Sequence, residues 1–300
     1  MPDDTLELLA AEIGRQAADL LAQGLIWLPG MAPLLAKHEW AALERQSGLL
    51  PPSYGTDRVR EGDPEGALNV FAEIRTPEAI ELSMPAMIVE HPFRSESYYR
   101  TLDISFYGAR ELDAFLVIRK IRSAFDCLSL AQDLIASILH LVRVIHIVRP
   151  PDPAYDVSHS DPQVPFSVFV SLPEDETERG RLRLAEEILH EAMHLQLTLL
   201  EGHTPLVKRP EAARYSPWKR MARPIQGVMH GLYVFGVIDA FLEVVEGSCD
   251  SQTIHYVRDR RAQIAEEVTE ATSPVFREDL TDVGTLLLNA IVARFTNANR

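Results

Sequence analysis

The sequence predicts an α+β protein that is mainly α-helical, with a helical domain around a small β-sheet. Long segments repeat apolar residues at helical spacing, which indicates amphipathic helices. Two short segments, 142–148 and 165–172, are rich in β-branched or aromatic residues and indicate strands. The chain has 300 residues, of which 46% are hydrophobic and 24% charged, as is typical of globular proteins. We expect a sheet of two to four strands.

The first 96 residues divide into a helical part and a loop-rich part. Residues 4–27 predict a helix, because apolar residues such as Leu9 and Ile13 recur at helical spacing, and residues 35–49 predict a second helix. Prolines and glycines interrupt residues 50–96, which we interpret as a connector or a substrate-shaping segment. We expect an N-terminal region of residues 1–96 and a metal-binding catalytic domain of residues 97–300, unless the two form one continuous domain.

The remaining elements follow in alternation. Residues 110–141 predict a helix ending at His140, followed by the strand at 142–148, a polar loop from Tyr155 to Asp161 and the strand at 165–172. Further helices are expected at about 178–201, 225–247, 252–271 and 278–297. Several prolines lie between the helices at 178–201 and 225–247, and there we expect turns.

Composition excludes several classes of function. The formal net charge is −15 and the pI is about 5.1, so the surface repels phosphate backbones and we expect no nucleic-acid partner. The acidic start and the lack of an apolar run of about 18 residues predict neither a signal peptide nor a membrane span. Cys127 and Cys249 form no ligand pattern, so we expect two buried, inert thiols in a cytoplasmic protein. Nothing in the sequence indicates the oligomeric state.

A metal site is predicted by the motif His190-Glu191-Ala192-Met193-His194. His190 and His194 are four residues apart on a helix, which places both imidazoles on one face with a rise of about 6 Å. Such a pair can share one divalent metal, and an adjacent glutamate is the hallmark of the HExxH motif. The alternative interpretation is a hydrogen-bonded network in the core.

The surroundings of the pair favour the metal. Glu187, His190, Glu191, His194, Thr198 and Glu201 form a narrow polar stripe with apolar residues on both sides. Buried polar groups must be satisfied, and a metal does that well. Glu201 lies about 10 Å along the helix axis from His194, so it cannot bind the same metal while the helix is straight.

His230 is the best candidate for the third ligand, which would place the metal site between the HExxH helix and the long helix that follows. His230 shares a face with Val234 and Val237, whereas three acids point the opposite way: Asp239, Glu243 and Glu246. The alternative is a core histidine that bonds a carbonyl group.

The segment 215–224 contains several residues suited to a pocket. Ser216 and Pro217 could cap a short helix, and Trp218 could form a pocket wall. Three cations, Lys219, Arg220 and Arg223, could bind an anion beside the metal, and arginine is well suited to a carboxylate. The alternative is a loop that packs Trp218 and solvates its charges.

Taken together, HEAMH, SPWK and RPIQGVMHGLYVF, with the loop Ser158-His159-Ser160-Asp161, resemble the HExxH-type 2-oxoglutarate-dependent peptide β-hydroxylases. The resemblance covers about residues 140–245. These enzymes accompany ribosomally made, post-translationally modified peptides. The resemblance implies a non-haem iron dioxygenase whose substrate is a ribosomal precursor peptide. Lys219 stands where an arginine is expected.

The resemblance also implies roles for individual residues. Fe(II) would be held by His190, His194 and His230, a set that differs from the usual two histidines and one carboxylate. The co-substrate 2-oxoglutarate would bind the metal and place its far carboxylate on Arg223, and O2 would take the remaining position. The implied co-substrate site also includes Lys219, Arg220, Ser216 and Trp218. The implied peptide contacts are Ser158, Ser160 and Tyr233. Glu191 would handle a proton rather than bind the metal.

Two rival functions use the same residues. In a zinc metallopeptidase, Zn²⁺ would take the three histidines and Glu191 would be the general base. The peptidase pattern HExxHxxGxxH is excluded because residues 197 and 200 are both leucine. The peptidase pattern with a downstream glutamate as third ligand is unsupported, because the available glutamates face away from the site. The third hypothesis is a non-catalytic peptide-binding protein with a vestigial metal site. Imidazole binds zinc and iron alike, so the motif does not choose between the metals.

Overall fold

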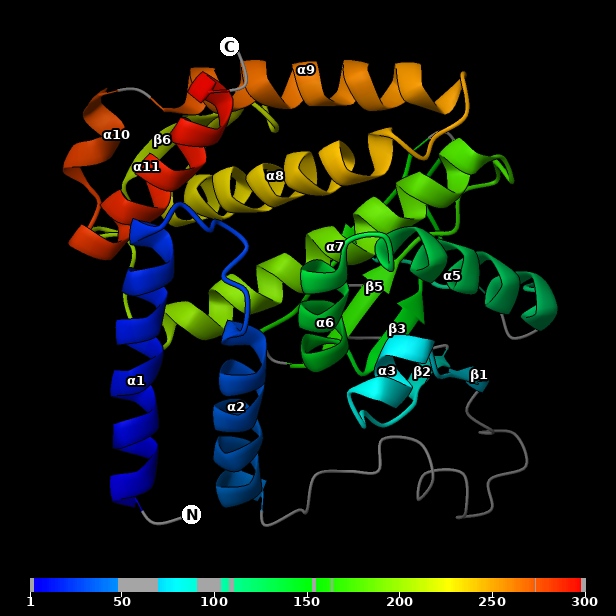
Figure 1. Cartoon of the computed structure of the whole chain (residues 1–300), viewed down its shortest axis with the longest axis horizontal. Coiled ribbons are helices and arrows are strands. Elements are labelled where there is room, and N and C mark those ends of the chain that lie inside the picture. The colour runs from blue at the N-terminus through cyan, green and yellow to red at the C-terminus, as the bar shows by residue number, and fades with distance from the viewer. Residues whose placement is uncertain are drawn as a thin grey trace. The chain divides into compact units, whose positions relative to one another are not determined.

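The computed structural model describes residues 3–47, 70–90, 104–107, 111–152, 155–162, 164–272 and 274–297 (Figure 1). It confirms a mainly helical α+β fold with a five-stranded mixed sheet and a separate two-stranded sheet. The chain forms two compact units. The sheet unit is Trp40–Leu195, and the helical unit combines Met1–Glu39 with Gln196–Arg300. The bounds of these units differ from the boundary that we expected at residue 96. The division into an N-terminal region and a catalytic domain stays a prediction.

The sheet unit contains the predicted strands and three that the sequence did not indicate. Its strands are β1 (Val70–Ile74), β2 (Met87–Glu90), β3 (Val144–Ile147), β4 (Ser158–His159) and β5 (Ser167–Val170). Their order is β1-β2-β3-β5-β4, with β2, β3 and β5 parallel and with β1 and β4 antiparallel at the two edges. β3 and β5 confirm the two predicted strands. All their residues are buried, as expected of inner parallel strands.

Helices α3 (Pro77–Glu81), α5 (Ala114–Leu128), α6 (Gln132–Leu141) and most of α7 (Glu178–Glu201) complete this unit. The single helix expected over 110–141 is wrong, because the chain breaks between α5 and α6. After Ser129, the backbone N–H groups of Leu130 and Ala131 bond carbonyls three residues back rather than four, and α5 ends. Residues 50–96 also hold β1, α3 and β2 rather than loop alone; residues 48–69 and 91–103 lie outside the described residues.

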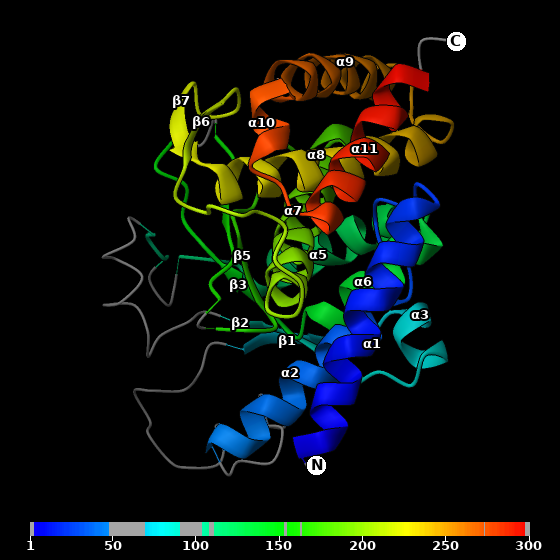
Figure 2. The ribbon, with the colours of Figure 1, turned by 90° about the vertical axis from the view of Figure 1, so that its left-hand side faces the viewer.

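The helical unit is built on one apolar helix. Its elements are α1 (Asp3–Ala22), the start of α2 (Met31–Ser47), β6 (Ala213–Ser216), β7 (Met221–Pro224), α8 (Ile225–Glu246), α9 (Thr253–Ala271), α10 (Pro274–Glu278) and α11 (Asp282–Asn297). Helices α9 and α11 both pack against α8 (Figure 1), and α1 packs against α11 (Figure 2). Most of α8 is buried. Among the described helices, α8 alone is long and apolar enough to cross a membrane, but a buried core helix has the same properties.

The helix expected over 278–297 is confirmed as α11, which begins four residues later at Asp282, and the short α10 precedes it. Two other predictions are corrected. Ser216 and Pro217 cap no helix, because β6 and β7 form a hairpin in which Ser216 pairs with Met221. The turn closes with Arg220 at φ 51°. Cys127 and Cys249 are half-buried rather than buried, although burial does raise the pKa of the Cys127 thiol and so keeps it protonated.

The first turn of α7 requires a glycine. A Cβ atom on Gly180 would lie 1.9 Å from the carbonyl oxygen of Asp175. We therefore expect Gly180→Ala to lower the free energy of unfolding by about 1–3 kcal/mol, because the backbone must shift. Urea denaturation followed by circular dichroism measures it.

Gly14 provides the matched control, because it is also helical but a Cβ atom there meets nothing within 4 Å. Gly14→Ala is expected to be neutral or to stabilise the protein by about 0.5–1 kcal/mol. Equal stability of Gly180→Ala and the unsubstituted protein would contradict the close approach.

Candidate functional site

The two histidines of the HExxH motif converge on α7. The Nε2 atoms of His190 and His194 are 3.1 Å apart, although the residues are one helical turn apart. Two imidazole nitrogens that bind one metal at about 2.1 Å, with an angle of roughly 90–109°, lie about 3.0–3.4 Å from each other. Both side chains are half-buried. The pair therefore has the spacing of two ligands of one metal ion, with a side open to further ligands.

Glu191 is held by the edge strand β4. Its carboxylate is buried, and Oε1 accepts a hydrogen bond of 2.6 Å from the Ser158 hydroxyl. The same oxygen lies 3.8 Å from His190 Nε2. The structure thus brings Glu191 and Ser158 together, a contact that the sequence did not predict. Ser160 is half-buried just beyond β4.

A second carboxylate of α7 is anchored one turn earlier. Glu187 is buried, and its Oε2 accepts hydrogen bonds from the backbone N–H and the hydroxyl of Ser171, at 3.2 and 3.4 Å. Its Oε1 has no hydrogen-bond partner among the described residues. Burial, and then the negative charge of Asp156, raise the pKa of Glu187 well above its ordinary value. Glu187 therefore favours its neutral form, whereas the sequence had identified it only as part of the polar stripe.

His230 belongs to the helical unit and bonds a carboxylate there. Its Nε2 lies 2.9 Å from Oε2 of Glu201, which also accepts a hydrogen bond of 2.8 Å from Gln226. The expected alternative was a bond to a carbonyl group. Within the described ranges, no three His, Cys, Asp or Glu side chains are arranged to hold a metal. The role of His230 as the third ligand stays a prediction.

The three acids that were rejected as ligands are engaged by arginines. Asp239 and Glu243 each bond both Arg261 and Arg294, and Glu246 bonds Arg258 and Arg261. The arginines therefore engage all three acids, including the buried Asp239.

The predicted co-substrate residues lie on the β6–β7 hairpin and in its turn. Lys219, Arg220 and Arg223 are exposed and form no ion pair among the described residues, so their charges are available. Ser216 is buried. Trp218 stacks on Phe235, with ring centroids 5.2 Å apart. Its ring would also lie 2.9 Å from a Cβ atom on Gly231, so Trp218 packs the hairpin onto α8.

Tyr233, the predicted peptide contact on α8, is fully buried, and burial raises the pKa of its hydroxyl group. It lies in the core of the helical unit in this structure. Its role as a peptide contact therefore stays a prediction.

A cavity of about 420 Å³ lies in the sheet unit and includes Ser171, the residue that holds Glu187. Its other walls include Tyr107, Tyr155, Arg149 and Asp156. The sequence did not reveal this cavity, because its residues come from segments that only the folded sheet brings together.

Neither protein-family models nor curated proteins gave a match to this chain.

The histidine pair can be tested by metal titration of the metal-free protein. Loss of even an outer partner of a metal ligand costs about 10–100-fold in affinity. We therefore expect His190→Ala and His194→Ala each to weaken Zn²⁺ binding by at least about 100-fold, measured by isothermal titration calorimetry. His255→Ala, on the exposed side of α9, is the control and should bind as before. Unchanged affinity in either α7 variant would contradict the proposed ligands.

Glu187 predicts a pH-dependent stability. Because its folded pKa lies above the unfolded value, near 4.5, its contribution is complete below about pH 4.5 and is lost as the pH rises through the folded pKa. We expect Glu187→Gln to remove this loss and to be the more stable protein at neutral pH.

Urea denaturation at several pH values measures the difference between Glu187→Gln and the unsubstituted protein. Glu270→Gln, an exposed substitution on α9, should leave the pH profile unchanged. A difference that stays constant from pH 4 to neutral pH would show that Glu187 does not titrate as proposed.

Proposed function

We propose that this protein is an Fe(II)/2-oxoglutarate-dependent oxygenase that hydroxylates the β-carbon of a residue in a ribosomally made precursor peptide in the cytoplasm. The observation that carries this proposal is the converging pair His190 and His194 beside the buried Glu191. The sequence context of the pair, with SPWK and RPIQGVMHGLYVF, favours the oxygenase over other HExxH proteins.

His190 and His194 would hold the metal, with His230 as the proposed third ligand. Fe(II) with 2-oxoglutarate and O2 would supply the oxidising power for breaking a C–H bond. Ser158 donates a hydrogen bond to Glu191, which stabilises the carboxylate form and holds it beside His190. Glu191 is thus suited to accept a proton next to the metal without binding it.

The hairpin would bind the co-substrate. Arg223 is our choice for the far carboxylate of 2-oxoglutarate, because its guanidinium forms no ion pair among the described residues and can give two parallel hydrogen bonds. Lys219 and Arg220 would add positive charge. Ser216 and Trp218 would act by holding the hairpin in place, which their burial and packing support.

We expect an extended peptide to bind beside Glu191. Within the described part of the chain, β4 pairs with β5 alone, so its other edge is free to pair with a peptide strand. Ser158 belongs to this edge strand, and Ser160 follows it. The cavity that includes Tyr107 and Tyr155 lies in the same unit and could receive a side chain of the peptide.

A zinc peptidase is the second candidate. The favouring observation is that Glu191 Oε1 lies 3.8 Å from His190 Nε2, close enough for a general base that activates a metal-bound water. The free edge of β4 would serve a peptidase equally well.

The oxygenase predicts a specific product. With Fe(II), 2-oxoglutarate and O2, a precursor peptide encoded beside the gene should gain one oxygen atom, located at a β-carbon by fragmentation mass spectrometry. Arg223→Ala should raise the KM for 2-oxoglutarate by about 10-fold or more, because a charge-assisted hydrogen bond contributes about 1.5–3 kcal/mol. Arg75→Ala removes an exposed arginine between β1 and α3 and should leave this KM unchanged.

Other results of the same assays would favour the two rival functions. Cleavage of the peptide by the zinc-loaded protein without 2-oxoglutarate would support the peptidase. Peptide binding without conversion by either metal form would support the non-catalytic protein. If His230→Ala keeps its full metal content, the third ligand lies elsewhere.

A further inference from the structure

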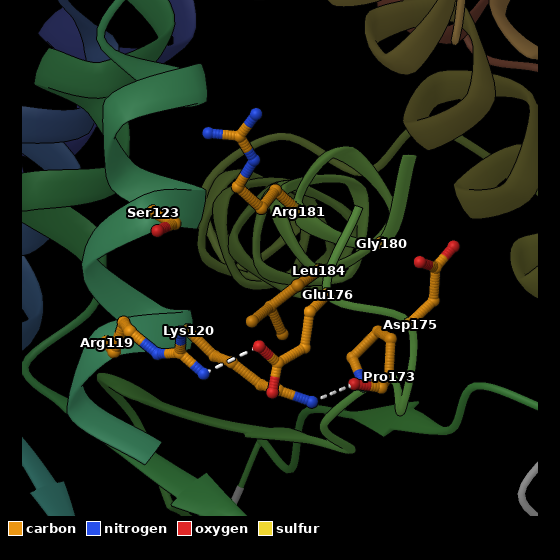
Figure 3. Close-up of a pocket in the computed structure, with 9 residues that line it drawn as sticks. All are labelled: Arg119, Lys120, Ser123, Pro173, Asp175, Glu176, Gly180, Arg181 and Leu184. Carbon is orange, nitrogen blue, oxygen red and sulfur yellow. Dashed lines mark hydrogen bonds and ion pairs between the residues drawn. The ribbon is translucent and has the colours of Figure 1, made fainter. Parts of the chain in front are cut away.

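A small cavity of about 190 Å³ lies between α5 and the first turns of α7 (Figure 3). Three basic side chains line it, Arg119 and Lys120 from α5 and Arg181 from α7. Ser123 of α5 lies on the same side as the two α5 cations. All of these residues belong to the sheet unit, and none was assigned a role above.

The acids of the cavity are already engaged. Glu176 forms an ion pair of 2.7 Å with Arg119. Asp175 accepts a hydrogen bond of 2.8 Å from the backbone N–H of Thr177 and forms an ion pair of 3.1 Å with Arg179. Each lining carboxylate therefore has an arginine partner other than Arg181, although both carboxylates also act on Lys120 through space.

Two cations and a hydroxyl group remain available. Lys120 donates to the backbone carbonyl of Pro173, which uses one of its three donors. The guanidinium of Arg181 forms no ion pair with any residue described, and the hydroxyl of Ser123 has no hydrogen-bond partner there. Burial lowers the pKa of Lys120, so its charged form would gain from an anion nearby.

We propose that this cavity binds a compact dianion, either phosphate or a small dicarboxylate, through Lys120, Arg181 and Ser123. The three cations of the lining outnumber its two carboxylates, which favours an anion. The volume of about 190 Å³ is well below the roughly 300–1,000 Å³ of pockets for drug-sized ligands, which favours a ligand of few atoms. Arg181 extends away from the Arg119–Glu176 pair, and its long side chain can turn toward the anion (Figure 3).

Such an anion would connect α5 to α7, the helix that carries the histidine pair. The site is separate from the proposed metal and co-substrate residues. Its binding can therefore be measured on metal-free protein without peptide, and it does not depend on the proposed enzymatic activity.

Isothermal titration calorimetry at constant ionic strength tests the site with inorganic phosphate and, in a second arm, with succinate. We expect saturable binding of at least one of them with one site per chain. Lys120→Met and Arg181→Gln should each weaken it by about 10-fold or more, because each removes a charge-assisted hydrogen bond. Lys120→Arg should keep most of the affinity, since the charge is retained.

Two controls separate this site from other positive charges. Arg122→Gln removes an exposed cation of α5 that does not line the cavity, and Arg75→Ala removes an exposed cation between β1 and α3 that does not line it either. Both should bind the dianion as the unsubstituted protein does. If Lys120→Met does not fold, the exposed Arg181→Gln still provides the test. No saturable binding of either anion, or equal loss in Arg122→Gln, would overturn the proposal.

Discussion

The need to satisfy two buried carboxylates on one helix shapes the centre of the sheet unit. Glu187 and Glu191 are one turn apart on α7, which is a rise of about 6 Å. Their donors, Ser171 and Ser158, belong to neighbouring strand ends, and neighbouring strands are about 4.8 Å apart. Because these spacings are similar, serines at two adjacent strand ends can donate hydrogen bonds to glutamates on two successive turns of one helix. A buried carboxyl group without any hydrogen-bond partner would cost about 1–3 kcal/mol, so the strand ends and the helix must stay in register with each other.

This constraint also positions the histidines. With Glu187 and Glu191 turned to the strand ends, His190 and His194 lie on the half-buried part of the same stripe, where their Nε2 atoms meet. The antiparallel pairing of β4 with β5 places Ser158 opposite Val170, one residue before Ser171. A shift of one residue in this register would turn Ser158 away from Glu191. The candidate site is thus a direct consequence of the strand pairing.

In the helical unit, charge is arranged around an apolar helix. The acids near the end of α8 pair with arginines of α9 and α11, which lets a helix that is otherwise apolar carry Asp239 in the buried core. Toward the start of α8, Glu201 holds Gln226 and His230, and Trp218 covers Gly231. The acids of α8 and Glu201 thus have their partners within the unit. Among the described residues the exposed cations of the hairpin form no ion pair, which makes them candidates for binding an anion.

The sequence by itself determined α7, α8, α9 and the strands β3 and β5, because each carries a strong local pattern of apolar residues. It also determined the histidine pair, since positions four apart on a helix share a face. Local patterns missed β1, β2 and β4, which are short strands formed by pairing within the sheet. They also missed the hairpin β6–β7, whose segments ARYS and MARP carry no alternating apolar pattern. The break between α5 and α6 was also missed, because the apolar periodicity over 110–141 does not indicate it. Only the tertiary structure placed Ser158 on Glu191, Ser171 on Glu187 and Lys120 on the carbonyl of Pro173, because each contact joins residues far apart in the chain.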